Sequence, residues 1–444
     1  MSELLEIAKN AAALALKVGA TEASASAYKT REVELTWRDG KVEKTSEATT
    51  RGLSVALYVD GKYSAVSTSD LRPDAVSKFL EETLAMTKTL ARDPFRSLPD
   101  PKLYEGRAKL DLQLADPAYD SLTAEQRLAW AKELEEGARS AKFGEFGADS
   151  LVSVSAYVSD SFTERARVTT NGFEGQAAGT AYWLYAGVTA KDPDGRRPEG
   201  SAGGGARHLT DLASAGGFGR EATERAFGCI GAKKAPSQVV PVVVENRVVG
   251  RLFGALARGL SGRALQQKQS FLEGKLDTQI TAPLLDVRDD PHIKKGFGSR
   301  LYDGEGFASK PFPVIDKGVL KTFYIDDYYG RKLGMAPTTA GSSNLVFGVG
   351  KKGAAALIAD VGNGILITGF LGGNSNPTTG DFSFGIQGFL IENGKQTAPI
   401  SEMNVSGNLL ELWSHLSALG SDPYPYTSVL TPTMVFDGVQ VAGA

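Results

Sequence analysis

Six side chains that could bind a metal ion lie close together in the C-terminal half of the sequence. Three aspartates and a histidine fall within seven residues, and two further acids follow: Asp286, Asp289, Asp290, His292, Asp303 and Glu305. Carboxylate oxygens with one imidazole could form an oxygen-rich metal site. Because the spacing fits neither one face of a helix nor a calcium-binding loop, we favour an acidic loop in which Pro291 sets a turn.

Residues that could act as nucleophiles or bases are scarce. The sequence has three histidines, His208, His292 and His415, no two of them near in sequence, and one cysteine, Cys229. We interpret His208 and His415 as ordinary hydrogen-bonding residues. A single cysteine excludes an intrachain disulfide and a cysteine-rich metal site. A serine, histidine and acid triad stays open, although the G-x-S-x-G elbow is absent from the sequence.

A glycine pattern typical of phosphate-binding loops spans residues 348–353. Its letters, GVGKKG, match G-x-G-x-x-G and precede the apolar run 354–361, so strand, phosphate loop and helix could follow one another. However, the preceding run 344–347 is short, Asp360 comes early for a ribose contact, and no series of β-α-β units surrounds the pattern. We therefore do not predict a nucleotide site.

An aromatic cluster lies at residues 324–329. It consists of three tyrosines beside two aspartates: Tyr324, Tyr328, Tyr329, Asp326 and Asp327. These side chains could line a groove. They could equally divide between a buried core and a solvated face, which is the interpretation we favour.

Length and composition narrow the class of protein. At 444 residues the chain is too long for one ordinary core, so we expect two or three domains. Apolar residues make up 42% and charged residues 23%, and 51 glycines favour a turn-rich fold with much sheet. The formal net charge is −3 and no long basic run occurs, which argues against a nucleic acid partner.

The sequence does not indicate secretion or membrane insertion. Glu3 and Glu6 stand where a signal peptide has a basic start. The uncharged run 361–380 is long enough to cross a bilayer, but glycine, asparagine and proline interrupt it. Because the single cysteine also permits a reducing compartment, we predict a cytoplasmic protein with no membrane partner.

The first half of the chain alternates between helical and strand patterns. Apolar spacing predicts helices over 2–18, 73–91, 123–142 and 220–228. Alternation predicts strands over 33–37 and 55–59, from Val152 to 158, and in parts of 165–170 and 180–189, with turns at 39–40 and 171–172. In the first helix we place Leu4, Leu5, Ala8, Ala12, Ala15 and Leu16 on one face. Residues 93–117 are interpreted as a connector and the glycine-rich run 191–205 as an exposed loop.

The second half begins after a cluster of glycine, lysine and proline at residues 230–238. A β-branched strand over 239–244 and a buried helix over 248–260 follow, and residues 314–320 form a hairpin around Asp316-Lys317-Gly318. The stretch 362–408 alternates glycines with β-branched and aromatic runs, and Asn393-Gly394 suits a tight turn. We predict a compact sheet there with close backbone approaches.

The same stretch carries a family resemblance. Residues 376–394 read NPTTGDFSFGIQGFLIENG, and YDGEG at 302–306, IDKGVL at 315–320, SFL at 270–272 and NGF at 171–173 precede them. In order and spacing these motifs resemble the TldD/PmbA family, whose members are known as modulators of DNA gyrase or microcin-processing peptidases. The resemblance implies an α+β fold of two domains, 1–229 and 230–444, with a sub-boundary near 93–117 and a C-terminal domain rich in antiparallel sheet.

The resemblance also points to a missing metal site. In the family's peptidase branch, the helix after the opening strand of the C-terminal domain carries H-E-x-x-x-H, and a cysteine further along completes the zinc site. Here the equivalent helix, residues 246–260, contains no histidine, glutamate or cysteine. The chain is therefore similar to the PmbA/TldE-like branch, and we expect no cofactor in it and zinc in a partner subunit.

What the resemblance implies for function follows from that absence. The chain would be a non-catalytic subunit that holds unfolded or leader peptides for a TldD-like zinc peptidase, with a homodimer also open. The motif match assigns peptide binding or assembly to Gly380, Asp381, Phe382 and Phe384, and no catalytic residue. The alternatives are a peptidase acting alone through an unidentified site and a peptide-binding protein without proteolytic function.

Overall fold

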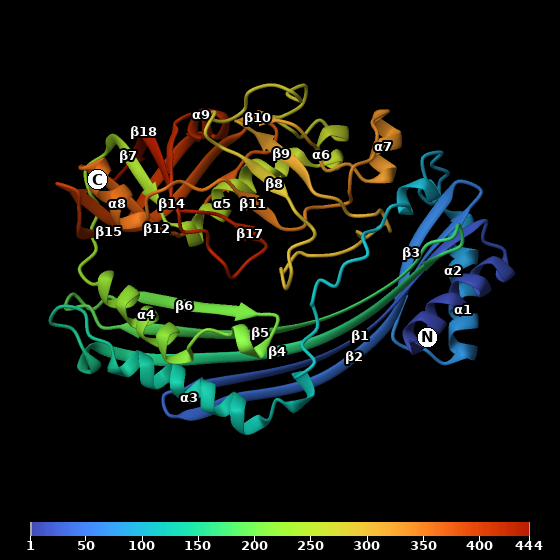
Figure 1. Ribbon diagram of the computed structural model, residues 1–444, viewed down its shortest axis with the longest axis horizontal. Helices are drawn as coiled ribbons and strands as arrows, with labels where there is room; N and C mark the ends of the chain where they lie inside the picture. Colours follow the sequence, from blue (N-terminus) through green and yellow to red (C-terminus); the bar gives the residue numbers. More distant parts are fainter. Residues whose placement is uncertain (1, 444) are drawn as a thin grey trace.

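The computed structural model describes residues 2–443, and it has an α+β fold built from a bent N-terminal sheet and a C-terminal sheet-rich half (Figure 1). Met1 and Ala444, the outer ends of the two predicted domains, lie outside the described residues. The concave side of the N-terminal sheet faces the C-terminal half (Figure 1).

The N-terminal sheet has six antiparallel strands in the order β3-β2-β1-β4-β5-β6. Their bounds are β1 Glu22–Arg38, β2 Lys41–Val59, β3 Lys62–Thr68, β4 Leu151–Thr169, β5 Glu174–Ala190 and β6 Glu199–Ala206. The predicted exposed loop at 191–205 is therefore wrong over its second half, since residues 199–206 form β6 and pair with residues 182–189 of β5. The alternation also misplaced Val152, which is exposed because a bulge shifts the register there.

Four helices pack against this sheet: α1 Glu3–Val18, α2 Pro73–Thr89, α3 Ala124–Ser140 and α4 Ala215–Gly228. The first helix begins at its cap Ser2 and ends at Gly19. Glycine suits this position because its φ of 115° is a left-handed conformation that a residue with a Cβ rarely adopts. Leu16, which the helical spacing put on the buried face, is exposed instead. Under the sheet Arg127 of α3 and Asp160 of β4 form a buried two-point ion pair, at 2.6 and 2.9 Å.

The predicted connector, residues 93–117, is a strap that crosses between the two halves (Figure 1). On one side its Leu114 carbonyl accepts from the Thr180 amide of β5 at 2.9 Å, and on the other the Leu112 carbonyl accepts from the Lys295 amide at 2.8 Å. The strap is therefore bonded to both halves. The chain's 3-10 turns are η1 Pro101–Tyr104, η2 Tyr119–Ser121, η3 Ala148–Ser150, η4 Leu209–Asp211 and η5 Arg258–Leu260.

The larger C-terminal sheet closes on itself. It consists of β7 Gln238–Val244, β12 Gly364–Phe370, β13 Asn374–Ser375, β14 Asp381–Glu392, β15 Lys395–Asn408, β16 Leu416–Leu419 and β18 Met434–Ala442. Because β12 pairs with both β7 and β14, the order β12-β7-β18-β15-β14 returns to β12. Closure removes the free edges of these strands. The Asn393-Gly394 turn joins β14 to β15, as the sequence predicted.

A smaller sheet packs beside it in the order β10-β9-β8-β11-β17. Its strands are β8 Val287–Asp289, β9 Phe312–Asp316, β10 Val319–Leu320, β11 Leu345–Phe347 and β17 Val429–Leu430. The remaining helices are α5 Asn246–Ala257, α6 Gly262–Gln266, α7 Asp327–Leu333, α8 Ala354–Val361 and α9 Leu409–Ser414. Within residues 2–443, no helix has both the length and the apolar character needed to cross a membrane.

Candidate functional site: a groove over the concave sheet

A row of polar side chains runs along β4 on the concave face of the N-terminal sheet. Every second residue contributes to it: Ser153, Ser155, Tyr157, Ser159, Ser161, Thr163, Arg165 and Arg167. The residues between them include Val154, Ala156 and Val158, which are buried on the opposite face. The apolar residues of this alternation predicted the strand. The polar residues between them were equally visible in the sequence but were not recognised as part of a site.

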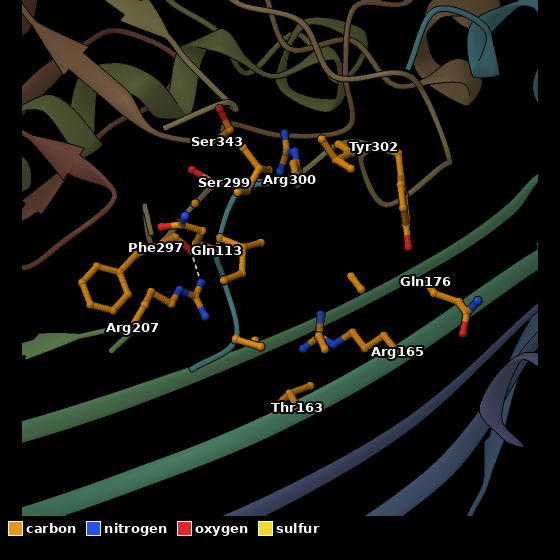
Figure 2. A pocket seen from close by; sticks show the side chains of 18 of the residues that line it. Gln113, Thr163, Arg165, Gln176, Arg207, Phe297, Ser299, Arg300, Tyr302 and Ser343 are labelled. Carbon is orange, nitrogen blue, oxygen red and sulfur yellow. Dashed lines mark hydrogen bonds between the residues drawn. The ribbon is translucent and has the colours of Figure 1, made fainter. Parts of the chain in front are cut away.

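The row opens into a first cavity of about 1430 Å³ between the two halves (Figure 2). In Figure 2, Thr163, Arg165 and Gln176 rise from the sheet, while Arg300 and Tyr302 come from the facing loop. Residues 110–117 of the strap form a side wall. The first cavity is thus defined by three separate segments of the chain.

The arginines of the first cavity lack carboxylate partners within the described residues. Arg207 donates to the carbonyls of Thr180 and Phe297, at 3.0 and 2.8 Å, and Arg300 to the carbonyls of Gly341 and Ser342. The Nε atoms of Arg167, Arg207 and Arg300 are buried without a hydrogen-bond partner. Burial lowers the pKa of Arg207, since no anion offsets its desolvation.

A second cavity of about 1290 Å³ continues along the same sheet face. The arginines that line it are paired: Arg225 of α4 bonds Glu245 at both guanidinium ends and also Glu221 at 3.1 Å. Arg247 of α5 lies 3.0 Å from Glu221 as well. This arrangement ties α4 to the C-terminal half. In the same cavity the half-buried Cys229 thiol has a pKa raised by burial.

An aromatic stack stands between the two cavities. The rings of Trp183 and Phe297 lie 5.0 Å apart at 25°, and Trp183 lines the second cavity while Phe297 lines the first. The Arg207 guanidinium sits 5.5 Å from the Phe297 ring. The stack therefore joins the sheet to the facing loop at the middle of the groove.

The acidic residues singled out in the sequence support the structure of the loops. Asp289 is buried and accepts from the Tyr324 hydroxyl at 2.9 Å and from the amide and hydroxyl of Ser343. Asp303 is buried and accepts four hydrogen bonds, three of them from backbone amides. Asp290 caps its own turn through the His292 amide. Among residues 2–443, no three acidic, histidine or cysteine side chains are grouped to hold a metal.

Glu305 behaves differently from these acids. Burial raises its pKa to about 7, while a hydrogen bond from the Asp327 amide at 2.9 Å opposes the shift. Asp326, Asp303 and Asp327 add negative charge around it and raise the pKa further. Its neighbour Gly304 lines the first cavity, whereas Glu305 itself lines neither cavity.

The tyrosine cluster forms part of the joint between the halves. Tyr328 of α7 donates to Asp93 of the strap at 2.7 Å, and the guanidinium of Arg96 lies 3.5 Å from its ring centroid. Tyr324 donates to Asp289 within the C-terminal half. The cluster is therefore divided between an internal support and a contact across the halves.

The glycine pattern at 348–353 does lie between β11 and α8. However, β11 pairs antiparallel with β8 and parallel only with the short β17, and not within a series of β-α-β units. The Gly350 amide donates to the Gly420 carbonyl at 2.8 Å, and Lys352 pairs with Asp360. These groups are used within the protein, in agreement with the interpretation that this is not a phosphate loop.

The residues assigned by the motif match lie on the closed sheet. Phe382 and Phe384 are buried in its core, with rings 5.3 Å apart. Gly380 is in a turn with φ of 82°. Asp381 is exposed and accepts from the Thr379 hydroxyl and from Asn408. None of these four described residues lines either cavity.

The helix at the position of the family's metal site is α5. Its buried side includes Val249, Leu252, Phe253, Ala255 and Leu256. Its outward side carries Arg247, Gly250, Arg251 and Gly254. None of these four residues offers a ligand to a zinc ion: Arg247, 15% exposed, pairs with Glu221 at 3.0 Å, and Arg251 is exposed.

Comparisons with known proteins agree on one family. Residues 23–87, 117–229 and 237–443 match domain 1, the central domain and the C-terminal domain of the PmbA/TldA metallopeptidases. A crystal structure from Bacteroides thetaiotaomicron, named as a candidate modulator of DNA gyrase, is 39% identical with a TM-score of 0.96, and the match covers 100% of both chains.

Two further relatives extend this result. The chain is 25% identical to metalloprotease PmbA from Escherichia coli O157:H7, over 97% of this chain and 94% of the relative. The fold also matches TldE from Thermococcus kodakarensis, with a TM-score of 0.85 at 21% identity, covering 98% of this chain and 100% of TldE.

Proposed function

Because the chain belongs to the PmbA/TldD family, we propose that it is the non-catalytic subunit of a two-component metalloprotease and holds the polypeptide substrate. Its relatives are named metalloproteases, so a peptidase-related role is the common element. The assignment as the non-catalytic subunit depends on whether this chain has the residues that bind zinc and hydrolyse peptides.

The observation that carries the proposal is the outward face of α5. In the family's peptidase branch this helix supplies two histidines and a glutamate, whereas here it carries Arg247, which pairs with Glu221, and the exposed Arg251. An activated water is what makes peptide hydrolysis fast, and a zinc ion supplies it by lowering the pKa of bound water towards about 7. We therefore assign zinc and hydrolysis to a TldD-like partner.

The groove over the concave sheet supports the role of holding substrate. Its row of serine, threonine and tyrosine hydroxyls offers acceptors to the backbone amides of any peptide, independently of side-chain sequence, although Ser153, Ser155 and Tyr157 donate their hydrogens to Asp39, Gly187 and Glu34. The two cavities along one sheet face suit an extended chain better than a compact ligand. An unfolded or leader peptide fits this shape.

Assembly with the partner is the role that suits the Gly380 to Phe384 turn. Asp381 is exposed there, outside both cavities, while Phe382 and Phe384 fix the strand beneath it. We assign these residues to contact with a second subunit, either a TldD-like chain or a second copy of this chain. In this proposal the complex works in the cytoplasm.

The decisive experiment mixes the purified chain with an H-E-x-x-x-H relative from the same organism. We expect a complex by native mass spectrometry, cleavage of an unfolded protein by the complex alone, and loss of that cleavage with a chelator. Zinc measured by elemental analysis should follow the partner and not this chain.

Two controls make the result interpretable. Changing the glutamate of the partner's H-E-x-x-x-H to glutamine should abolish cleavage while leaving the complex intact. Chelator-resistant cleavage by this chain alone, surviving repeated purification, would show that it has its own catalytic residues and would refute the proposal.

A further inference from the structure

We propose that the first cavity binds acidic side chains of an extended polypeptide, with aspartate or glutamate at alternate positions, through Arg165 and Arg167. The proposal rests on the substrate-holding function in one respect only, namely that the ligand is a polypeptide. It adds the chemical class of that ligand and the side chains that select it.

Positive charge in the first cavity exceeds what the protein compensates. Four arginines line it, Arg165, Arg167, Arg207 and Arg300, together with Lys295. Lys295 is neutralised by Asp211 at 2.7 Å. The cavity's acids are Asp111, which is exposed, and Asp303, whose carboxylate accepts from backbone amides. A chain with a net charge of −3 thus has an uncompensated cationic pocket.

The two arginines nearest the sheet have the freedom and spacing to read a peptide. Arg165 is exposed with no hydrogen-bond partner among residues 2–443, and Arg167 bonds only the Ser26 hydroxyl, at 3.2 Å. Being two apart on one strand, their side chains rise from the same face about 6.6 Å apart. An extended peptide repeats at the same interval, so carboxylates on alternate residues meet both guanidinium groups.

Arg207 and Arg300 add to the positive potential of the first cavity. Their guanidinium groups are fixed by backbone carbonyls, and the Nε of each is buried without a partner. A buried cation bonded only to neutral groups keeps most of its charge available to a ligand in the cavity. Nearby anionic groups of a bound peptide would supply the missing counter-charge.

The aromatic rings of the cavity favour a peptide over a single-stranded nucleic acid. Bases need open ring faces on which to stack. Phe297 is covered by Trp183 at 5.0 Å and by Arg207, whereas Tyr302 packs against Phe173 and lies 4.9 Å from the Arg107 guanidinium. Phe297 and Tyr302 are therefore engaged within the protein. Among the described residues that line the cavity, Tyr28 is the one ring left open, at 38% exposure, which is fewer rings than a stacking platform for successive bases needs.

The test measures binding by the full chain alone, without a protease partner. A short synthetic peptide that alternates glutamate with serine is compared with the same peptide carrying glutamine, using fluorescence anisotropy at low and high salt. We expect the glutamate peptide to bind about tenfold more tightly, with a preference that shrinks as salt rises. The double variant Arg165→Gln/Arg167→Gln should remove the preference.

Matched variants separate charge from folding. Arg197→Gln removes an exposed arginine outside both cavities and should leave the affinity unchanged. Arg165→Lys/Arg167→Lys keeps the charge and should retain a preference for the glutamate peptide, and circular dichroism checks the fold of each variant. Equal affinity for the two peptides, an unaffected double variant, or tighter binding of a single-stranded oligonucleotide would each overturn the proposal.

The result is separable from that of the protease experiment. Peptide selection by the isolated chain without any partner-dependent cleavage would support this inference and refute the proposed function. Partner-dependent cleavage with no preference for acidic peptides would do the reverse.

Discussion

In the second cavity Arg225 and Arg247 lie against Glu221 and Glu245. In the first cavity, among the described residues, Arg165 has no hydrogen-bond partner and Arg300 bonds only neutral groups, namely backbone carbonyls and the Thr339 hydroxyl. Both cavities lie over the same face of one sheet and are similar in volume, about 1290 and 1430 Å³. The two cavities differ in whether their arginines form ion pairs with carboxylates of the protein.

This difference suggests that the charges of the second cavity stabilise the fold, whereas those of the first cavity bind a ligand. Paired charges hold two elements together, and removing one partner leaves the other uncompensated in a partly dry site. Unpaired charges contribute little to folding and are free to meet a ligand. We therefore expect mutations in the second cavity to change stability and mutations in the first to change binding.

The largest expected effect concerns Glu305, the acid next to Gly304 of the first cavity. Glu305 has a folded-state pKa of about 7 against 4.5 for the free side chain, so the folded protein binds its proton more tightly than the unfolded chain does. The contribution of Glu305 to the free energy of unfolding is therefore complete below pH 4.5 and is lost as the pH rises towards 7. Urea unfolding should show a loss on the order of 3 kcal/mol from this group between pH 4.5 and pH 8.

The variant Glu305→Gln isolates that contribution. Glutamine cannot ionise, so the difference in unfolding free energy between variant and native protein should grow in favour of the variant as the pH rises. Asp327, whose pKa burial also raises, contributes in the same direction and stays in both proteins. Parallel pH profiles for the two proteins would show that Glu305 ionises normally.

The next effect tests the paired cavity directly. Glu245→Gln removes one carboxylate from Arg225, whose side chain is 23% exposed, and should lower the free energy of unfolding by about 2 kcal/mol. Arg165→Gln in the first cavity is the matched control and should change stability by less than about 0.5 kcal/mol. Equal losses in the two variants would remove the distinction between the cavities.

Much of this fold was readable from the sequence where local patterns agree with the tertiary structure. The hairpin at Lys317-Gly318 and the turn at Asn393-Gly394 combine positive φ angles with flanking β-branched residues, so turn chemistry and pairing point to one answer. The G-x-G-x-x-G pattern precedes no series of β-α-β units, since β11 pairs antiparallel with β8 and parallel only with the short β17.

The failures have a shared physical cause. Residues 199–206 read GSAGGGA after their glutamate and have no strand propensity, yet β5 imposes a strand on them by pairing. The glycines of 362–408 predicted close backbone approaches, such as Gly388 of β14 against Leu366 of β12, but not that β12 pairs with both β7 and β14 and so closes the sheet. Arg207 and Arg300 reach the first cavity from distant loops. Long-range contacts of this kind leave no local signal.

A smaller effect is expected at the stack between the cavities. Trp183→Ala removes the contact with Phe297 and should lower the free energy of unfolding by about 1 kcal/mol, because aromatic pairs contribute that much beyond their burial. It should also join the two cavities, which lengthens the groove. Trp183→Phe keeps the stack and serves as the control. A fully stable alanine variant would show that the stack does not connect the halves.

The smallest change in stability is expected for Asp381→Ala. This carboxylate is exposed and bonds only the Thr379 hydroxyl and the Asn408 amide group, so the midpoint of thermal unfolding should move by less than about 2 °C. Since Asp381 lies outside both cavities, binding of the glutamate peptide should stay within about twofold of native. If the turn contacts a second subunit, sedimentation velocity should nevertheless show weaker assembly with the zinc-binding partner. Lost peptide affinity with unchanged assembly would instead place Asp381 in the substrate path and extend recognition beyond the first cavity.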